Sequence, residues 1–96
     1  MTSVAVIGLG RVGLPLALSF ADRGVETIGV EREDSVLSAI DAGEMPFQET
    51  GTQELLDEVL RDGRFERTRV VSEAAQADHI VLTLGTPAHV HIEIDV

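Results

Sequence analysis

The sequence predicts an α/β protein with a parallel sheet and helices on both faces of that sheet. Short apolar runs alternate along the chain with longer amphipathic stretches, which is the order of a β-α-β succession. The first apolar run is continuous and partly β-branched, as a strand buried on both faces requires. A glycine-rich segment follows it directly. The sheet is expected to be the first half of a doubly wound fold, since a complete fold has two such halves.

Each element of the first part of the chain has a local justification. The first strand is expected over residues 4–7, and the glycines after it lead into a helix over residues 12–23. Pro15 is tolerated there because the amides of a first helical turn have no acceptor within the helix. Gly24 is suited to the position that closes the helix. A second strand is then expected over residues 25–30.

The second part of the chain continues the same alternation. Acids and a serine at 33–35 precede apolar residues at helical spacing, and Gly43 ends that short helix. Thr50 and Gln53 have the spacing of a capping box before an apolar stripe that Gly63 closes. The remaining expectations are a third strand over 68–71, a short helix over 72–77, a fourth strand over 79–84, and either strand or extended loop over 88–96.

Size and charge limit what the protein can be. The 96 residues are 44% hydrophobic and 25% charged, which suffices for one core and not for two. The 17 acids and seven scattered arginines give a net charge of -10, which repels nucleic acid and anionic lipid. No apolar run reaches the roughly 20 residues of a membrane span, and the amino terminus lacks the basic start of a signal peptide. The sequence thus predicts a cytoplasmic protein that binds neither nucleic acid nor membranes.

The strongest functional signal is a G-x-G-x-x-G motif over residues 8–13, between the first strand and the first helix. Gly8 allows the tight turn, Gly10 lets main-chain amides approach a pyrophosphate, and Gly13 lets the helix pack closely on the strand. The helix start, with Arg11 and Val12, adds partial positive charge. Arg11 could lean over the pyrophosphate, although an ordinary exposed arginine explains it more simply. The motif predicts a dinucleotide site.

The second strand ends in an acid placed for the ribose of that dinucleotide. Glu31 stands 18 residues after Gly13, where its carboxylate would accept hydrogen bonds from the adenosine ribose hydroxyls. A ribose 2′-phosphate would be repelled by this carboxylate, with Arg32 partly compensating. The cofactor is therefore expected to be NAD, with NADP as the alternative. A simpler explanation of Glu31 is that it is a solvated acid on the protein surface.

Two further positions are candidates, namely Thr86 at the expected ligand-binding edge and Glu49 in the loop before the second long helix. Thr86 follows the fourth strand and could hydrogen-bond the cofactor, or could simply end the strand together with Pro87. Glu49 is better explained as an acid that complements a helix dipole.

A possible metal row lies near the end of the sequence. His89, His91 and Glu93 would share one face of a strand, as zinc ligands can. Since the chain has no Cys and no further ligand is evident, an exposed polar edge explains them better, and no metal is expected.

Residues 4–17, Val-Ala-Val-Ile-Gly-Leu-Gly-Arg-Val-Gly-Leu-Pro-Leu-Ala, resemble the opening of the UDP-glucose/GDP-mannose dehydrogenase family. Later landmarks follow in family order, namely Ala42-Gly43-Glu44-Met45-Pro46 with Glu49, Leu55-Leu56, Ala77-Asp78 and Gly85-Thr86-Pro87. The last of these looks closest to the UDP-N-acetylmannosamine dehydrogenase branch. The resemblance identifies residues 1–96 as an N-terminal dinucleotide-binding domain of Rossmann type, expected to be a truncated part of a longer protein.

The resemblance implies an NAD-dependent enzyme of polysaccharide biosynthesis that oxidises the C6 alcohol of a UDP-sugar to a carboxylate. It implies cofactor contacts at Gly8, Gly10, Gly13, Glu31 and Thr86. The family's catalytic Cys, Lys and Asn are residue types that this sequence does not contain, so the segment alone is expected to be inactive and to hold no catalytic residue. The sequence departs from the family at two positions, with Glu31 for the usual Asp and Val36 where some relatives carry a basic residue.

Two other functions remain open from the sequence. A 3-hydroxyacid or 6-phosphogluconate-type dehydrogenase would open similarly and would bind NAD or NADP. A nucleotide-binding module without an enzymatic partner would need only the motif. An unpaired strand at the edge of the sheet favours self-association, so a homo-oligomer is expected.

Overall fold

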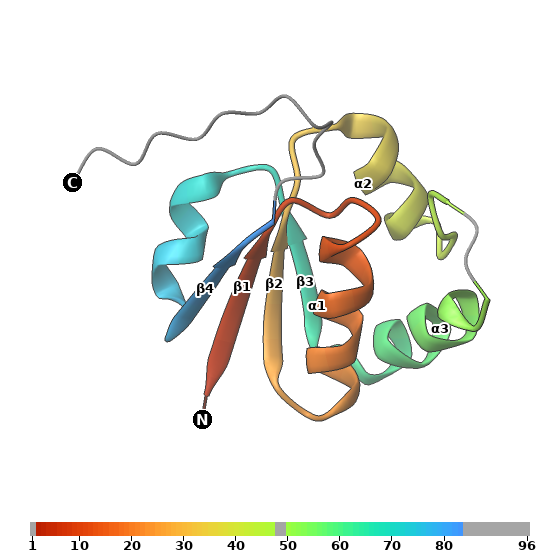
Figure 1. The fold of residues 1–96 in the computed structure, drawn as a ribbon, viewed down its shortest axis with the longest axis horizontal. Coiled ribbons are helices and arrows are strands. Elements are labelled where there is room, and N and C mark those ends of the chain that lie inside the picture. The colour runs from red at the N-terminus through yellow and green to blue at the C-terminus, as the bar shows by residue number, and fades with distance from the viewer. Residues whose placement is uncertain (1, 48–49, 84–96) are drawn as a thin grey trace.

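The computed structural model describes residues 2–47 and 50–83. Its elements are β1 (Ser3–Ile7), α1 (Gly13–Asp22), β2 (Glu26–Val30), α2 (Asp34–Asp41), α3 (Thr52–Asp62), β3 (Phe65–Thr68), the 3-10 helix η1 (Val71–Gln76) and β4 (His79–Leu82). The strands form one sheet of order β3-β2-β1-β4, and each neighbouring pair is parallel. Figure 1 shows the four strands pointing to one end, where the loop into α1 begins. This confirms the expected Rossmann-type α/β class.

The larger part of the core lies between the sheet and the helices α1, α2 and α3. Its buried side chains come from the first strand and its loop, from the three helices and from β3: Val6, Leu9, Leu14, Ala17, Leu18, Ala21, Ile40, Leu56, Val59 and Phe65. On the opposite face, η1 packs against β1 and β2, with Ala74 buried on Ala5 and Val30. Within residues 2–47 and 50–83, helices therefore cover both faces, but the second face is covered by a single short helix.

The third strand lies three residues earlier than the sequence predicted. It spans Phe65–Thr68 rather than residues 68–71, because Phe65 is only 3% exposed and enters the core. The β-branched Val70 and Val71, which suggested a strand, are 50% and 60% exposed. Residue type there was misleading because burial of the aromatic side chain decides the register. The following helix is a 3-10 helix that begins at Val71, one residue before the expected start.

The expected capping box of α3 is absent from the described residues. The N-cap is Gly51, with φ of +83°, and it makes no side-chain cap bond. Gln53 instead accepts a hydrogen bond from the Met45 amide at 3.0 Å and donates one to the Gly43 carbonyl at 2.8 Å. Gln53 thus holds the connection between α2 and α3. The N-cap of α2 is Glu33, also without a side-chain cap bond, rather than the expected serine.

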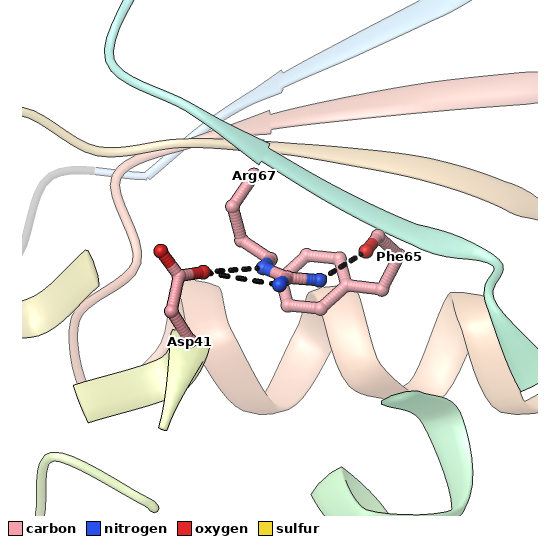
Figure 2. Close-up of polar contacts among 3 residues, drawn as sticks. All are labelled: Asp41, Phe65 and Arg67. Atoms are coloured by element: carbon pink, nitrogen blue, oxygen red, sulfur yellow. Dashed lines mark hydrogen bonds and ion pairs between the residues drawn. The ribbon is translucent and has the colours of Figure 1, made fainter. Parts of the chain in front are cut away.

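Two arginines on the β3 side bind acids of α2. Arg67 donates from Nε and Nη2 to one oxygen of Asp41 at 3.1 and 3.0 Å, and from Nη1 to the Phe65 carbonyl at 2.7 Å, as Figure 2 shows. Its guanidinium also lies over the Phe65 ring, 5.7 Å from the centroid. Arg69, just after β3, pairs with Asp34 at 2.6 Å. The two pairs fix the two ends of α2 to the β3 side of the sheet.

Among residues 2–47 and 50–83, no helix has the length and apolar character needed to cross a membrane.

Candidate cofactor site

The glycine loop is fixed to the ends of its two neighbouring strands. The Gly8 amide donates to the Val30 carbonyl at 2.8 Å, which joins the loop to β2. Gly8 has φ of +96°, and a Cβ there would collide with the Thr83 carbonyl oxygen. A side chain is therefore excluded at Gly8 both by its backbone conformation and by the strand beside it.

Gly13 begins α1 directly beneath this turn. A Cβ at Gly13 would collide with the Gly8 carbonyl and with the Thr83 hydroxyl. The absence of a side chain lets α1 start against the strand, and its first turn closes with the Leu14 amide on the Gly10 carbonyl at 3.0 Å. Within the described ranges, α1 has no side-chain cap bond at Val12 and no acid in its first turn. The positive end of the helix thus has no acid within its own first turn.

Thr83 is a site residue that the sequence interpretation missed. Its hydroxyl donates to the Gly8 carbonyl at 2.6 Å and lies 3.2 Å from the Ile7 carbonyl. Its amide also donates to Ile7 at 2.9 Å. The sequence feature that could have indicated it is a hydroxyl-bearing residue at the end of the fourth strand, since ligand sites of parallel sheets lie at the carboxyl ends of the strands. Thr83 fixes the conformation of the glycine turn from the β4 side.

Glu31 joins the glycine loop to the start of α2. One carboxylate oxygen accepts the Leu9 amide at 2.8 Å, and the other accepts the Glu33 amide at 2.9 Å. Glu31 is half-buried, while Leu9 is fully buried. Each oxygen keeps a second lone-pair position, since a carboxylate accepts about four hydrogen bonds. The acid predicted for the ribose is therefore already oriented beside the loop.

A cavity of about 540 Å³ opens over these residues. Of the predicted site residues, Gly8, Gly10, Glu31 and Arg32 line it. Its remaining wall includes Glu33, Val36, Arg69, Val71, Leu82 and Thr83. A volume of this size suits a small ligand.

The other predicted site residues lie elsewhere. Gly13 is buried at the start of α1. Val12 is 66% exposed, and the Arg11 guanidinium lies over the Phe47 ring, 5.4 Å from its centroid. Neither side chain is part of the cavity wall.

Thr86 lies outside the described residues, as do Glu49 and the candidate metal row of His89, His91 and Glu93.

Comparison with known proteins gives a consistent result. Residues 2–96 match the sequence model of the UDP-glucose/GDP-mannose dehydrogenase family, NAD binding domain. The chain belongs to this family. UDP-N-acetyl-D-mannosamine dehydrogenase of Campylobacter jejuni is 36% identical over 88% of the chain and 20% of its own length. GDP-mannose 6-dehydrogenase of Azotobacter vinelandii is 33% identical over 96% of the chain and 21% of its own length.

A solved structure gives the same family at the level of the fold. The UDP-glucose dehydrogenase of Pyrobaculum islandicum superposes with a TM-score of 0.85 at 34% identity, over 91% of this chain and 20% of that one. The chain thus spans about a fifth of the length of these nucleotide-sugar dehydrogenases. NAD is the cofactor of this family's domain. The family match favours a nucleotide-sugar dehydrogenase domain over the domain of a 3-hydroxyacid or 6-phosphogluconate-type dehydrogenase.

Proposed function

We propose that residues 1–96 are the N-terminal dinucleotide-binding part of a nucleotide-sugar 6-dehydrogenase that converts the C6 alcohol of a UDP-sugar to a carboxylate. The observation that carries the proposal is the glycine turn held from both sides, by Glu31 through the Leu9 amide and by Thr83 through the Gly8 carbonyl. A turn bonded in this way is rigid before any ligand arrives. Its rigidity lowers the ordering cost of binding a flexible dinucleotide.

The residues present are compatible with NAD. Gly8 and Gly13 have no space for a Cβ, so main chain alone forms the turn that would face the diphosphate. The amides at Gly10, Arg11, Val12 and Gly13, at the positive end of α1, would donate to the phosphate oxygens.

Further residues are proposed to contact the ribose and the outer part of the cofactor. Glu31 would accept hydrogen bonds from the ribose hydroxyls with its remaining lone pairs. Arg32, which lines the cavity, would lie at its outer rim, and Thr86 would contact the cofactor from the segment after β4.

The chemistry requires groups beyond this part of the protein. Bound NAD accepts a hydride, and oxidation of an alcohol to a carboxylate removes two hydrides and takes oxygen from one water, so two NAD molecules are consumed. The chain contains no Cys, Lys, Asn or Tyr, and none of its residues is proposed to transfer a proton or carry a covalent intermediate. Its task is to bind and orient the cofactor, and it is proposed to be inactive alone.

The site assignment is tested with Glu31→Gln. The glutamine NH₂ group would face one of the two main-chain N–H groups that now donate hydrogen bonds to the Glu31 carboxylate, and that hydrogen bond would be lost. The NAD affinity measured by calorimetry is expected to fall about tenfold, the effect of one charge-assisted hydrogen bond. Glu26→Gln is the matched control, since Glu26 is an exposed acid at the opposite end of the same strand.

The wild-type chain is expected to bind NAD more tightly than NADP. A folded wild-type sample that binds neither dinucleotide, or both equally weakly, would contradict the cofactor site. Equal losses in the two glutamate variants would contradict the role of Glu31.

We also propose that the whole enzyme is cytoplasmic and supplies sugar acids for polysaccharide biosynthesis. The relatives' nucleotide-sugar substrates support this setting. Cell fractionation with an antibody against the chain would test the location, and recovery in the membrane or secreted fraction would contradict it.

A further inference from the structure

We propose that Asp34 is a specificity-determining residue, because its ion pair with Arg69 withholds from a ribose 2′-phosphate a cation that lies beside Glu31. The inference rests on the proposed NAD site and concerns how that site rejects NADP. Arg69 lines the cavity, and Asp34 holds it with a contact of 2.6 Å. A binding site can reject a ligand by repelling it, and also by pairing the cation that would otherwise bind it with another group of the protein.

The strand register places Arg69 beside Glu31. Val30 pairs with Thr68 between β2 and β3, and the Glu31 amide donates to the Thr68 carbonyl at 3.0 Å. The next residue along β3 is therefore adjacent to the acid that would receive the ribose. A phosphate on the ribose 2′ oxygen would come within reach of both side chains, and it would need a cation to offset the Glu31 carboxylate.

Arg69 pairs with Asp34, whereas Glu31 binds main-chain amides. Both Glu31 oxygens are bonded, one to Leu9 and the other to Glu33. In the described part of the chain, Arg69 forms its ion pair with Asp34. Asp34 is the first residue of α2, where the helix dipole stabilises an anion.

The net charge around the cavity disfavours a ribose 2′-phosphate dianion. Four charged residues line the cavity, namely Glu31, Arg32, Glu33 and Arg69, and Asp34 pairs with the last of them. Together the five side chains carry one net negative charge. Loss of the Asp34 charge leaves this group neutral and releases one guanidinium. The pair is well exposed, 58% at Arg69 and 72% at Asp34, so the expected effect is moderate and sensitive to salt.

The test compares NAD and NADP affinities of Asp34→Asn by calorimetry at low salt. NADP affinity is expected to rise about three- to fivefold, the scale of one exposed ion pair, while NAD affinity stays within about twofold. Adding Arg69→Gln to Asp34→Asn is expected to remove the gain, and about 0.5 M salt is expected to shrink it. Thermal unfolding of each variant shows that the compared samples are folded.

Asp41→Asn is the matched control. It removes the same charge from the same helix and breaks the corresponding pair with β3 (Figure 2), but neither Asp41 nor Arg67 lines the cavity. Its NADP affinity is expected to match that of the wild type.

The inference is overturned by unchanged NADP affinity in Asp34→Asn, by a gain that persists without Arg69, or by an equal gain in Asp41→Asn. These outcomes, with NAD still bound by the wild type, leave the proposed function intact. A folded wild type that binds no dinucleotide overturns both.

Discussion

The two faces of the sheet are packed to very different degrees. The face under α1, α2 and α3 buries ten residues in one cluster, including Leu18 and Leu56 at 0% exposure. The face under η1 buries three, and the β4 side chains Ile80 and Leu82 remain 55% and 62% exposed. The glycine turn and the start of α1 belong to the packed face. The glycine turn is therefore supported by the more extensively buried part of the core, whereas the exposed apolar residues lie beside it on β4.

The largest expected effect is a core truncation on the packed face. Leu18→Ala removes a fully buried side chain of α1 and is expected to cost about 3 kcal/mol of unfolding free energy through lost burial and a cavity. Leu82→Ala removes the same atoms from the exposed β4 position and is expected to cost less than about 0.5 kcal/mol. Urea unfolding measures both. Similar losses would mean that the η1 face is packed as firmly as the other one.

The next effect concerns the bond that connects β4 to the glycine turn. Thr83→Val keeps the shape of the side chain but removes the hydroxyl that donates to Gly8, and it is expected to cost about 1 kcal/mol of stability. Because the turn then loses one of its two supports, NAD affinity is expected to fall about fivefold. Calorimetry and thermal unfolding measure the two quantities.

Thr83→Ser is the matched variant, because it retains the hydroxyl and loses only a methyl group. It is expected to keep most of the NAD affinity. If Ser and Val variants lose affinity equally, the methyl contact rather than the hydrogen bond supports the turn.

Local sequence signals were sufficient to place the first strand, the glycine turn and the acid after the second strand. The first strand, the glycine turn and Glu31 all follow one another within 31 residues, and each is marked by its own residue type. The motif needed no knowledge of tertiary pairing, because strand, turn and helix are consecutive in the chain.

The features that escaped prediction all depend on which strands become neighbours. Thr83 reaches Gly8 only because β4 pairs with β1, with Ile7 opposite Leu82. Arg69 meets Asp34 only because β3 ends beside β2. The start of β3 was misjudged for a related reason, since Phe65 is buried in a cluster that includes residues distant in sequence, such as Val6 and Leu18, while Val70 and Val71 are not buried. Residue type alone does not encode such contacts.

The smallest effect on stability is expected at the edge of β4. A substitution there also tests directly whether the face covered by η1 is less well buried than the other face. The other edge strand, β3, carries Glu66 and Arg67 in its sequence, and charged residues discourage pairing between sheet edges. The β4 segment is His-Ile-Val-Leu, and among the described residues it pairs only with β1. An apolar edge without charges is prone to pair with a second copy, which is the proposed basis of homo-oligomers.

Sedimentation velocity of the chain at increasing concentration measures that association. Ile80→Lys introduces a charge on the edge and is expected to shift the chain toward monomer, with a change in unfolding free energy below about 0.5 kcal/mol because the side chain is already exposed. Val70→Lys is the control, since Val70 is similarly exposed but lies outside β4. A wild-type chain that remains monomeric throughout, or an equal shift in both variants, would show that exposure of apolar residues on β4 does not drive association. The poorly covered face would then be stable in water as it stands.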